Sequence, residues 1–225
     1  MLNLMRSPYS ANQFLFLIFI LILVVVVIQV GAFTMALDKL GLSAYSAMLL
    51  LICTLMGSAI NLPLFSIQAK EPSEETKQIF RGLLFGRPLP FTGKTIVAIN
   101  VGGAIIPVSF SIYLINTNQL PLIHVILAIA TVTAVCRIFS QPIPRLGIGI
   151  PIFIAPITAA LTALSLAPEN SAPMAYICGT LGVLIGADLM RLQDIRKLGA
   201  PVASIGGAGT FDGIFLTGIV AVLLT

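Results

Sequence analysis

Residues 202–225 read VASIGGAGTFDGIFLTGIVAVLLT. The stretch is long and apolar enough to cross a bilayer, yet it carries one carboxylate, Asp212, and a glycine run at Gly206, Gly207 and Gly209. Glycine is a poor helix former because its backbone loses the most conformational freedom on folding. Whether this last helix begins before or after the glycines therefore decides how deep Asp212 lies in a membrane.

The whole chain has the composition of an integral membrane protein. Of its 225 residues, 58% are hydrophobic and only 9% are charged, whereas a soluble domain carries roughly 25% charged residues. The excess of Lys and Arg over Asp and Glu is then a matter of membrane topology. No basic patch with interleaved aromatic residues indicates a nucleic-acid surface, so we expect no nucleic-acid partner. The expected surroundings are the lipid bilayer of the cell (inner) membrane.

Apolar segments of about 20 residues, the length that crosses a bilayer, recur along the chain. They predict an all-α fold, a polytopic transmembrane helix bundle of about seven spans that forms a single integral membrane domain over residues 1–225. The expected spans are Phe14–Leu37, Ser43–Ile67, Thr95–Leu114, Pro121–Phe139, Ile148–Ala167, Pro173–Met190 and Val202–Thr225. The longest connection between them is residues 68–94.

Lysine and arginine are distributed unevenly between the two sides of this bundle. All but one of the 12 lie in the N-terminal tail and in the connections on the same side, and the exception is Lys39. Membrane proteins keep their positive residues on the cytoplasmic side. We therefore expect a cytoplasmic N-terminus, a cytoplasmic connection 68–94, and a C-terminus outside the cell.

Two aspartates lie on consecutive predicted spans. Asp188 precedes the expected cytoplasmic boundary by about one helical turn. Asp212 reaches a similar depth if the last helix begins after the glycines, near Thr210. A carboxylate in hydrocarbon costs at least about 2.5 kcal/mol, so both aspartates are candidate functional residues.

Other polar or flexible positions map to the same half of the bundle. Non-helical backbone at membrane depth is tolerated only against protein or water, so the glycine run predicts a cavity. We expect a polar, water-accessible pocket lined by Asn61, Asn100, Gly206, Gly207 and Gly209. For the two asparagines alone, hydrogen bonds between neighbouring helices are the simpler explanation.

Two carboxyl groups in one site can divide the work of hydrolysis. One stays ionised and acts as a base while the other keeps its proton and acts as an acid, because mutual repulsion separates their pKa values. The segment Gly186-Ala187-Asp188-Leu189 resembles the Gly-Ala-Asp variant of prepilin-peptidase-like enzymes. The segment from Gly209 to Phe215 is similar to the Gly-x-Gly-Asp region of presenilin-like intramembrane aspartyl proteases, with Phe211 in place of the second glycine. This resemblance implies Asp188 and Asp212 as catalytic residues and a transmembrane protein as substrate.

A second resemblance covers most of the chain. The ending Gly-Gly-Ala-Gly-Thr-Phe-Asp-Gly-Ile-Phe, together with Gly-Ala-Asp-Leu upstream, resembles an uncharacterised bacterial and archaeal membrane family known only as a domain of unknown function. This resemblance implies a polytopic membrane protein and no established activity.

Three classes of function remain open: an intramembrane aspartyl protease, a proton-coupled transporter, and a non-catalytic membrane scaffold or assembly factor. Structural roles are open as well. Asp188 has Arg191 at helical ion-pair spacing, and Asp212 can act as a helix N-terminal residue. Asp194 is expected to be a solvated loop charge.

No sequence feature indicates a cofactor or a metal ion. Three cysteines, Cys53, Cys136 and Cys178, lie inside apolar runs without metal-binding spacing, so we expect them to be packing residues. The sequence does not indicate an oligomeric state.

Overall fold

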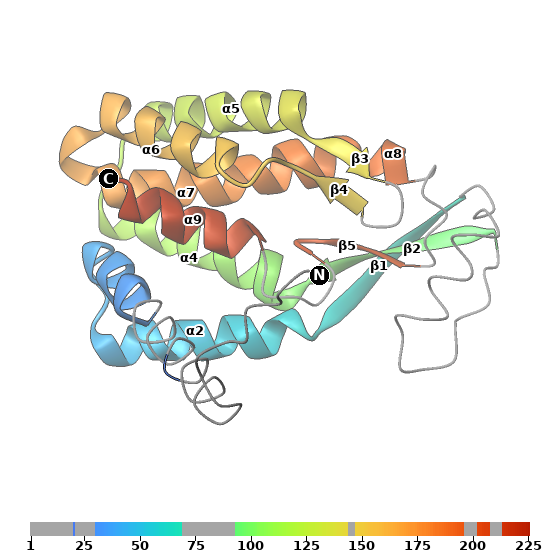
Figure 1. Cartoon of the computed structure of the whole chain (residues 1–225), viewed down its shortest axis with the longest axis horizontal. Helices are drawn as coiled ribbons and strands as arrows, with labels where there is room; N and C mark the ends of the chain where they lie inside the picture. The colour runs from blue at the N-terminus through green and yellow to red at the C-terminus, as the bar shows by residue number, and fades with distance from the viewer. Residues whose placement is uncertain (1–19, 21–29, 69–92, 144–146, 196–201, 208–212) are drawn as a thin grey trace, which may run out of the picture.

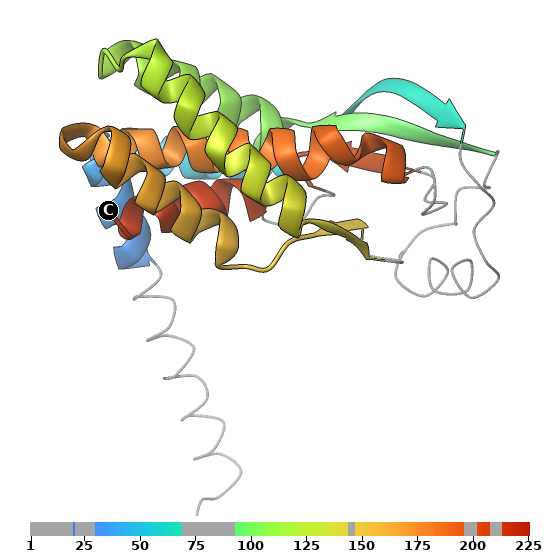
Figure 2. The same ribbon diagram turned by 90° about the horizontal axis from the view of Figure 1, so that it is seen from above.

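The structure is a computed structural model that describes residues 20, 30–68, 93–143, 147–195, 202–207 and 213–225. These residues form a bundle of helices with strands gathered at one end (Figures 1 and 2). A helical segment, Val30–Lys39, precedes the labelled helices. The helices are α2 Ala44–Ser58, α4 Ile106–Thr117, α5 Leu122–Phe139, α6 Ile154–Leu166, α7 Ser171–Val183, α8 Leu192–Ile195 and α9 Gly213–Leu223.

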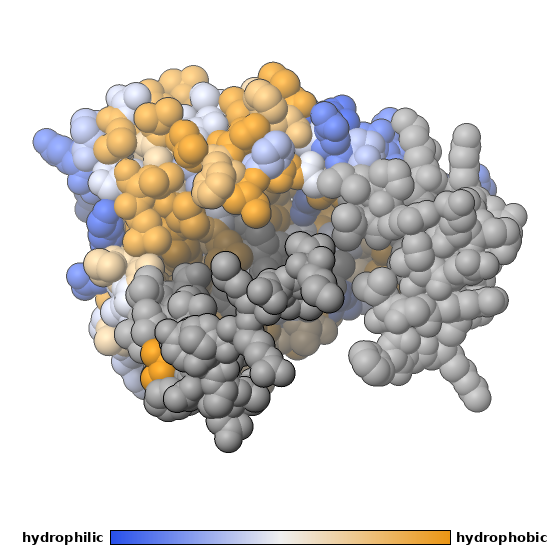
Figure 3. All heavy atoms as spheres, viewed as in Figure 1, coloured by the Kyte–Doolittle hydropathy of each residue, from blue (hydrophilic) through white to orange (hydrophobic). Residues whose placement is uncertain are grey.

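Several described helices have the character of membrane spans. Two are long and apolar enough to cross a bilayer, namely α5 and the continuous helix Pro168–Ile195 that contains α7. A third results if Val30–Lys39 and α2, which are bent by 113° at their junction, are taken as one span. Figure 3 shows apolar residues over α5 and α6, with hydrophilic residues at both ends of these helices. The chain therefore has the features of a membrane protein, while the number of about seven spans and the orientation stay predictions.

The central helix of the bundle is α7. It is buried along almost its whole length and packs against α5, α6 and α9. Small residues permit the close approach: a Cβ on Gly182 would lie 2.6 Å from Val132 Cβ. Helices in membranes associate through such small residues because lipid supplies no hydrophobic driving force between them.

Three strands form a sheet at one end of the bundle: β1 Asn61–Gln68, β2 Lys94–Asn100 and β5 Val202–Ile205. Strand β2 is central, with β1 antiparallel on one side and β5 parallel on the other. A second sheet pairs β3 Gln141–Ile143 with β4 Gly147–Gly149. The expected all-α fold is therefore wrong in part, because the fold is mainly helical with some strands.

Each strand of the larger sheet occupies one end of a predicted span. The helix predicted over Ser43–Ile67 ends at Ser58, because Pro63 lacks an N–H and forces the residue before it toward extended backbone. Pro63 is tolerated because β1 is an edge strand. The helix predicted over Thr95–Leu114 begins instead as a strand, since the β-branched run from Thr95 to Val97 favours extended backbone.

The last predicted span, Val202–Thr225, is also divided. Strand β5 ends at Ile205, and the next two residues, Gly206 and Gly207, have φ values of +87° and +95° that a helix cannot contain. Helix α9 is described from Gly213, so Gly206 and Gly207 lie outside it. Residues 208–212, which include Gly209 and Asp212, lie outside the described residues.

The remaining predicted spans are reproduced to different extents. The spans Pro121–Phe139 and Pro173–Met190 are confirmed as helical. The helix predicted over Ile148–Ala167 begins only at Ile154. Of Phe14–Leu37, only residues 20 and 30–37 are described, and they are helical, while residues 69–92 of the long connection lie outside the described residues.

Four short turns continue these helices. Two of them are π-helical: η1, Val101–Ile105, leads from β2 into α4, and η3, Leu184–Asp188, continues α7. The others are the 3₁₀ turns η2, Pro168–Asn170, and η4, Leu189–Arg191. Turns of the π type occur frequently at functional sites. Here η1 follows β2 directly, and η3 ends at Asp188, which bonds Gly206 just after β5.

Candidate functional site

The first element of the site is the carboxylate of Asp188. Asp188 is the last residue of η3 and is partly buried. The backbone N–H of Gly206 donates a hydrogen bond of 2.7 Å to Asp188 Oδ2. This bond joins the helix that carries Asp188 to the segment that leads toward Asp212, so the chain returns to Asp188 just before its last helix.

The position of Gly206 requires glycine for two reasons. Its φ of +87° is one that residues with a side chain rarely adopt. A Cβ at this position would also lie 2.7 Å from Ala104 Cβ and 2.7 Å from the carbonyl carbon of Gly103, both in η1. The backbone of Gly206 is therefore held between the two π turns, bonded to η3 and packed on η1.

A second polar cluster surrounds Asn100, whose side chain is 1% exposed. Asn100 Nδ2 donates to the Ser58 carbonyl oxygen at 2.7 Å and to Asn61 Oδ1 at 3.0 Å, and its Oδ1 accepts from the Gly103 N–H at 2.7 Å. Ser204 Oγ donates to Asn61 Oδ1 at 2.5 Å. The Asn100 side chain therefore bonds three elements together: the end of α2, strand β1 and turn η1.

The two clusters are adjacent because β5 contributes Ser204 to one cluster and leads directly into Gly206 of the other. Ser204 pairs with Ala98 of β2 in the parallel ladder, and Asn61 pairs with Asn100 in the antiparallel ladder. Two residues after Ser204, Gly206 reaches Asp188. Asn61, Asn100 and Gly206 therefore lie in one region, where they meet at strand ends and not on straight helices. The polar pocket expected from them stays a prediction.

Two predicted site residues, Gly209 and Asp212, lie outside the described residues. In the sequence Asp212 follows Gly206 by six residues and immediately precedes Gly213, the first residue of α9. The separation of the Asp188 and Asp212 carboxyl groups stays a prediction.

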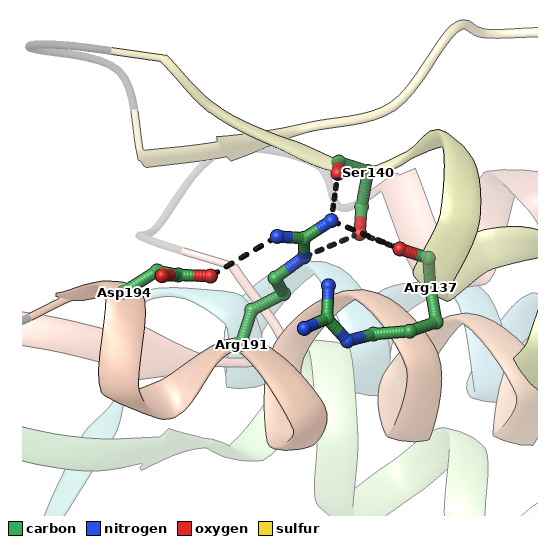
Figure 4. Close-up of polar contacts among 4 residues, drawn as sticks. All are labelled: Arg137, Ser140, Arg191 and Asp194. Carbon is green, nitrogen blue, oxygen red and sulfur yellow. Dashed lines mark hydrogen bonds and ion pairs between the residues drawn. The ribbon is translucent and has the colours of Figure 1, made fainter.

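The ion pair considered for Asp188 and Arg191 is not the one that forms. Arg191 Nη1 lies 3.1 Å from Asp194 Oδ2 in a salt bridge (Figure 4). Its other nitrogens donate to Ser140 Oγ at 3.0 Å, to the Arg137 carbonyl oxygen at 2.9 Å, and to the Ser140 carbonyl oxygen. Asp194 is therefore a paired residue and not a solvated loop charge, and Arg191 closes the carboxyl end of α5.

Some features of the site could not be found from sequence spacing. Ser204 lies on a strand that the apolar pattern assigns to a helix, and its contact with Asn61 spans 143 positions in the chain. The Arg191–Ser140 contact spans 51 positions. The available signals were the β-branched run from Thr95 to Val97, which favours a strand, and Pro63, which interrupts a helix.

Buried hydroxyl groups are a further feature of the bundle interior. Within the described residues, Tyr176 Oη and Thr180 Oγ1 make no hydrogen bond of normal geometry, although both side chains are fully buried. They lie one turn apart on α7, and the Tyr176 ring packs edge-on against Phe110 and Phe215. Buried hydroxyls are usually satisfied, so this pair marks a place where a water molecule or ligand would gain contacts.

Nothing in the described part of the chain forms a metal centre. No group of three or more His, Cys, Asp or Glu side chains is gathered there. Cys136 and Cys178 are buried and Cys53 is exposed, all as free thiols. The site is therefore built from carboxylate, amide and hydroxyl groups.

Comparison with known proteins places most of the chain in one family. The model of a family described as "Protein of unknown function (DUF1614)" matches residues 55–224, a range that includes every site residue discussed above. No curated protein and no solved structure matches the chain.

Proposed function

Because this chain belongs to the DUF1614 family of proteins of unknown function, we propose its activity from its own residues: it is an intramembrane aspartyl protease with Asp188 and Asp212 as the catalytic pair. The observation that carries the proposal is the 2.7 Å hydrogen bond from Gly206 to Asp188. It bonds Gly206, which precedes Asp212 by six residues in the sequence, to the first aspartate. Asp212 immediately precedes Gly213, the first residue of α9.

The proposed reaction is hydrolysis of a peptide bond. One carboxylate takes a proton from a water molecule while the water oxygen forms a bond to the amide carbon. The other carboxyl group donates its proton to the amide nitrogen, and the carbon–nitrogen bond breaks to give a carboxyl group and an amine. Two adjacent carboxyl groups suit this division because both cannot easily be ionised at once.

The sheet beside Asp188 supports a peptide as substrate. A peptide bond is accessible to attack when the chain around it is extended. Strand β5 is an edge strand in the order β1-β2-β5, so among the described strands its outer side has no partner. An extended peptide can add to such an edge through main-chain hydrogen bonds, and β5 ends one residue before Gly206.

The proposal includes a multi-pass position in the cell (inner) membrane, with the sheet end of the bundle facing the cytoplasm. The distribution of described basic residues supports it. Lys94, Arg137 and Arg191 belong to elements that meet at the sheet end, whereas Lys39 lies 3.4 Å from the Val222 carbonyl oxygen at the other end (Figure 1). Positive residues accumulate on the cytoplasmic side, which supports this orientation. The expected substrate is another transmembrane protein.

The experiment uses the full chain in proteoliposomes with a panel of fluorogenic single-span peptides. We expect Asp188→Asn and Asp212→Asn each to lower the cleavage rate by about 10² to 10⁴-fold, the range that a general acid or base contributes. Asp38→Asn is the matched control. Asp38 is an exposed aspartate next to Lys39, at the end of the bundle opposite the sheet. Full cleavage of a genuine substrate by Asp212→Asn would contradict the proposal.

A second candidate, a proton-coupled transporter, is favoured by one observation. The buried hydroxyls of Tyr176 and Thr180 lie one turn apart on the helix that leads to Asp188, as polar groups along a proton path would. A measurement of proton flux distinguishes the two functions. A transporter gives Asp188-dependent proton movement across the liposome membrane without peptide, and a protease does not.

A further inference from the structure

Two arginines, Arg137 and Arg191, lie together at the carboxyl end of α5 (Figure 4). Arg191 is fully engaged, because its guanidinium contacts Asp194, Ser140 and the Arg137 carbonyl oxygen. Its charge is offset by the Asp194 carboxylate at 3.1 Å. Arg191 therefore has little capacity left for a ligand, and its role here is to fix the end of α5.

Arg137 differs from Arg191 in the bonding of its guanidinium group. Its carbonyl oxygen accepts from Arg191, but within the described residues its own guanidinium has no bonded acceptor. In Figure 4 this side chain extends from α5 toward the helix that carries Arg191, so two guanidinium groups lie on the same side of one helix end. Two neighbouring positive charges repel each other unless an anion compensates the second one.

The surroundings of Arg137 are those of a membrane surface. The next two residues of α5, Ile138 and Phe139, are 71% and 47% exposed, and Met190 beside Arg191 is 52% exposed. Large apolar side chains with this exposure at the end of a membrane-spanning helix face acyl chains. The anions that occur at this level are phosphate groups of lipid headgroups.

We propose that the Arg137 guanidinium binds the phosphate of an anionic phospholipid, whose acyl chains lie on Ile138, Phe139 and Met190. The planar guanidinium matches two phosphate oxygens and forms paired charge-assisted hydrogen bonds. Basic residues at the ends of membrane helices select anionic headgroups in this way. The proposal is independent of the proposed proteolysis, because Arg137 contacts neither Asp188 nor Gly206 in the bonds that position them.

The test measures lipid retained by the full-length protein after extraction from membranes that contain phosphatidylglycerol and phosphatidylcholine, with native mass spectrometry as the readout. The wild-type protein should retain phosphatidylglycerol in preference to phosphatidylcholine. Arg137→Gln should lower phosphatidylglycerol occupancy by about fivefold, the contribution of one arginine near an anionic surface, and Arg137→Lys should lose less. The carbonyl oxygen that Arg191 uses is retained in both variants, which supports their folding.

Lys94→Gln is the matched control, since Lys94 is an exposed basic residue at the sheet end of the molecule. An equal loss of phosphatidylglycerol in this control would overturn the proposal, because binding would then depend on general surface charge. A wild-type protein that retains both lipids equally would also overturn it, and this result does not depend on any variant folding. A second arm adds inorganic phosphate: if phosphate displaces the lipid in an Arg137-dependent manner at low concentration, the ligand is a soluble phosphate and the lipid assignment fails.

Discussion

The continuous helices α5 and Pro168–Ile195 and the three interrupted segments of this chain all have apolar sequences, but their structures differ. In the continuous helices, glycine and alanine allow helices to pack on helices. In the interrupted segments, which contain α2 and β1, β2 and α4, and β5 and α9, helix changes to strand at the same level of the bundle. Hydropathy therefore indicates where a segment lies, whereas proline, β-branched residues and paired glycines decide whether it is helical.

The candidate site lies where the interrupted segments change between helix and strand. Backbone groups released by the ends of helices are bonded by Asn100 and Asp188. In a membrane such groups must find partners within the protein, because lipid offers none. The following variants test whether the interruptions or the continuous helices contribute more to the stability of the fold.

The largest effect is expected for Gly102→Ala at the junction of β2 and α4. A Cβ there would lie 2.0 Å from the Thr54 carbonyl oxygen and 2.3 Å from the Ser58 nitrogen. These are backbone atoms that cannot rotate away, so we expect a loss of about 3 kcal/mol in the free energy of unfolding. Thermal unfolding of the purified protein measures it. Gly31→Ala is the control, because a Cβ at Gly31 meets nothing within 4 Å, and an equal effect in both would remove the distinction.

A smaller loss is expected for Asn100→Ala. This change removes both hydrogen bonds from Nδ2 and the one that Oδ1 accepts, and it leaves the Gly103 N–H without its side-chain acceptor. An unsatisfied buried polar group costs about 2 kcal/mol. Asn61→Ala is the comparison, since Asn61 is exposed and should cost less. Faster hydrogen exchange confined to β2 and η1 would locate the loss at the junction.

Arg191→Gln tests the end of a continuous helix. The change removes the bonds to the Arg137 and Ser140 carbonyl oxygens and the salt bridge to Asp194. Hydrogen bonds to charged groups contribute about 1.5 kcal/mol or more, but the Arg191 and Asp194 side chains remain 15% and 19% exposed, so we expect a loss of about 1.5 kcal/mol. Arg191→Lys separates charge from geometry, because lysine keeps the charge and loses the fork of donors. If lysine restores full stability, the capping role assigned to the guanidinium is wrong.

The smallest effect is expected for Ser204→Ala in β5. It removes one hydrogen bond, to Asn61 Oδ1, at a cost of about 1 kcal/mol or less. The expected signature is faster amide exchange in β5 with unchanged exchange in α7. A uniform increase across the bundle would mean that β5 and the continuous helices unfold as one unit.

The sequence allowed part of this fold to be predicted, for physical reasons that differ between segments. Pro121–Phe139 was predictable because an uninterrupted apolar run of that length has one stable form in a bilayer. Thr95–Ile99 was not, because a short run of β-branched apolar residues fits a buried strand and a membrane helix equally well by hydropathy. The partner strands decide between them, and for β2 these are β1, Asn61–Gln68, and β5, Val202–Ile205.

The candidate site was predictable to a similar degree. Asp188, Asn61, Asn100 and Gly206 stand out as polar or flexible residues in apolar surroundings, and the structure brings them to one end of the bundle. Their partners were not predictable, because a hydrogen bond between Ser204 and Asn61 depends on strand register. The pairing of Arg191 with Asp194 in place of Asp188 depends on the turn that follows η3.

The parallel pairing of β2 with β5 has a consequence for biosynthesis. Ile96 pairs with Val202, and α4, α5, α6 and α7 are all made between the two. Those helices can enter the membrane as they leave the ribosome. Strand β2 can pair with β1 early, but it must wait for β5 until residues 202–205 have been translated. The Asp188–Gly206 contact closes at that late moment, so the growing chain carries an incomplete site through most of its insertion into the membrane.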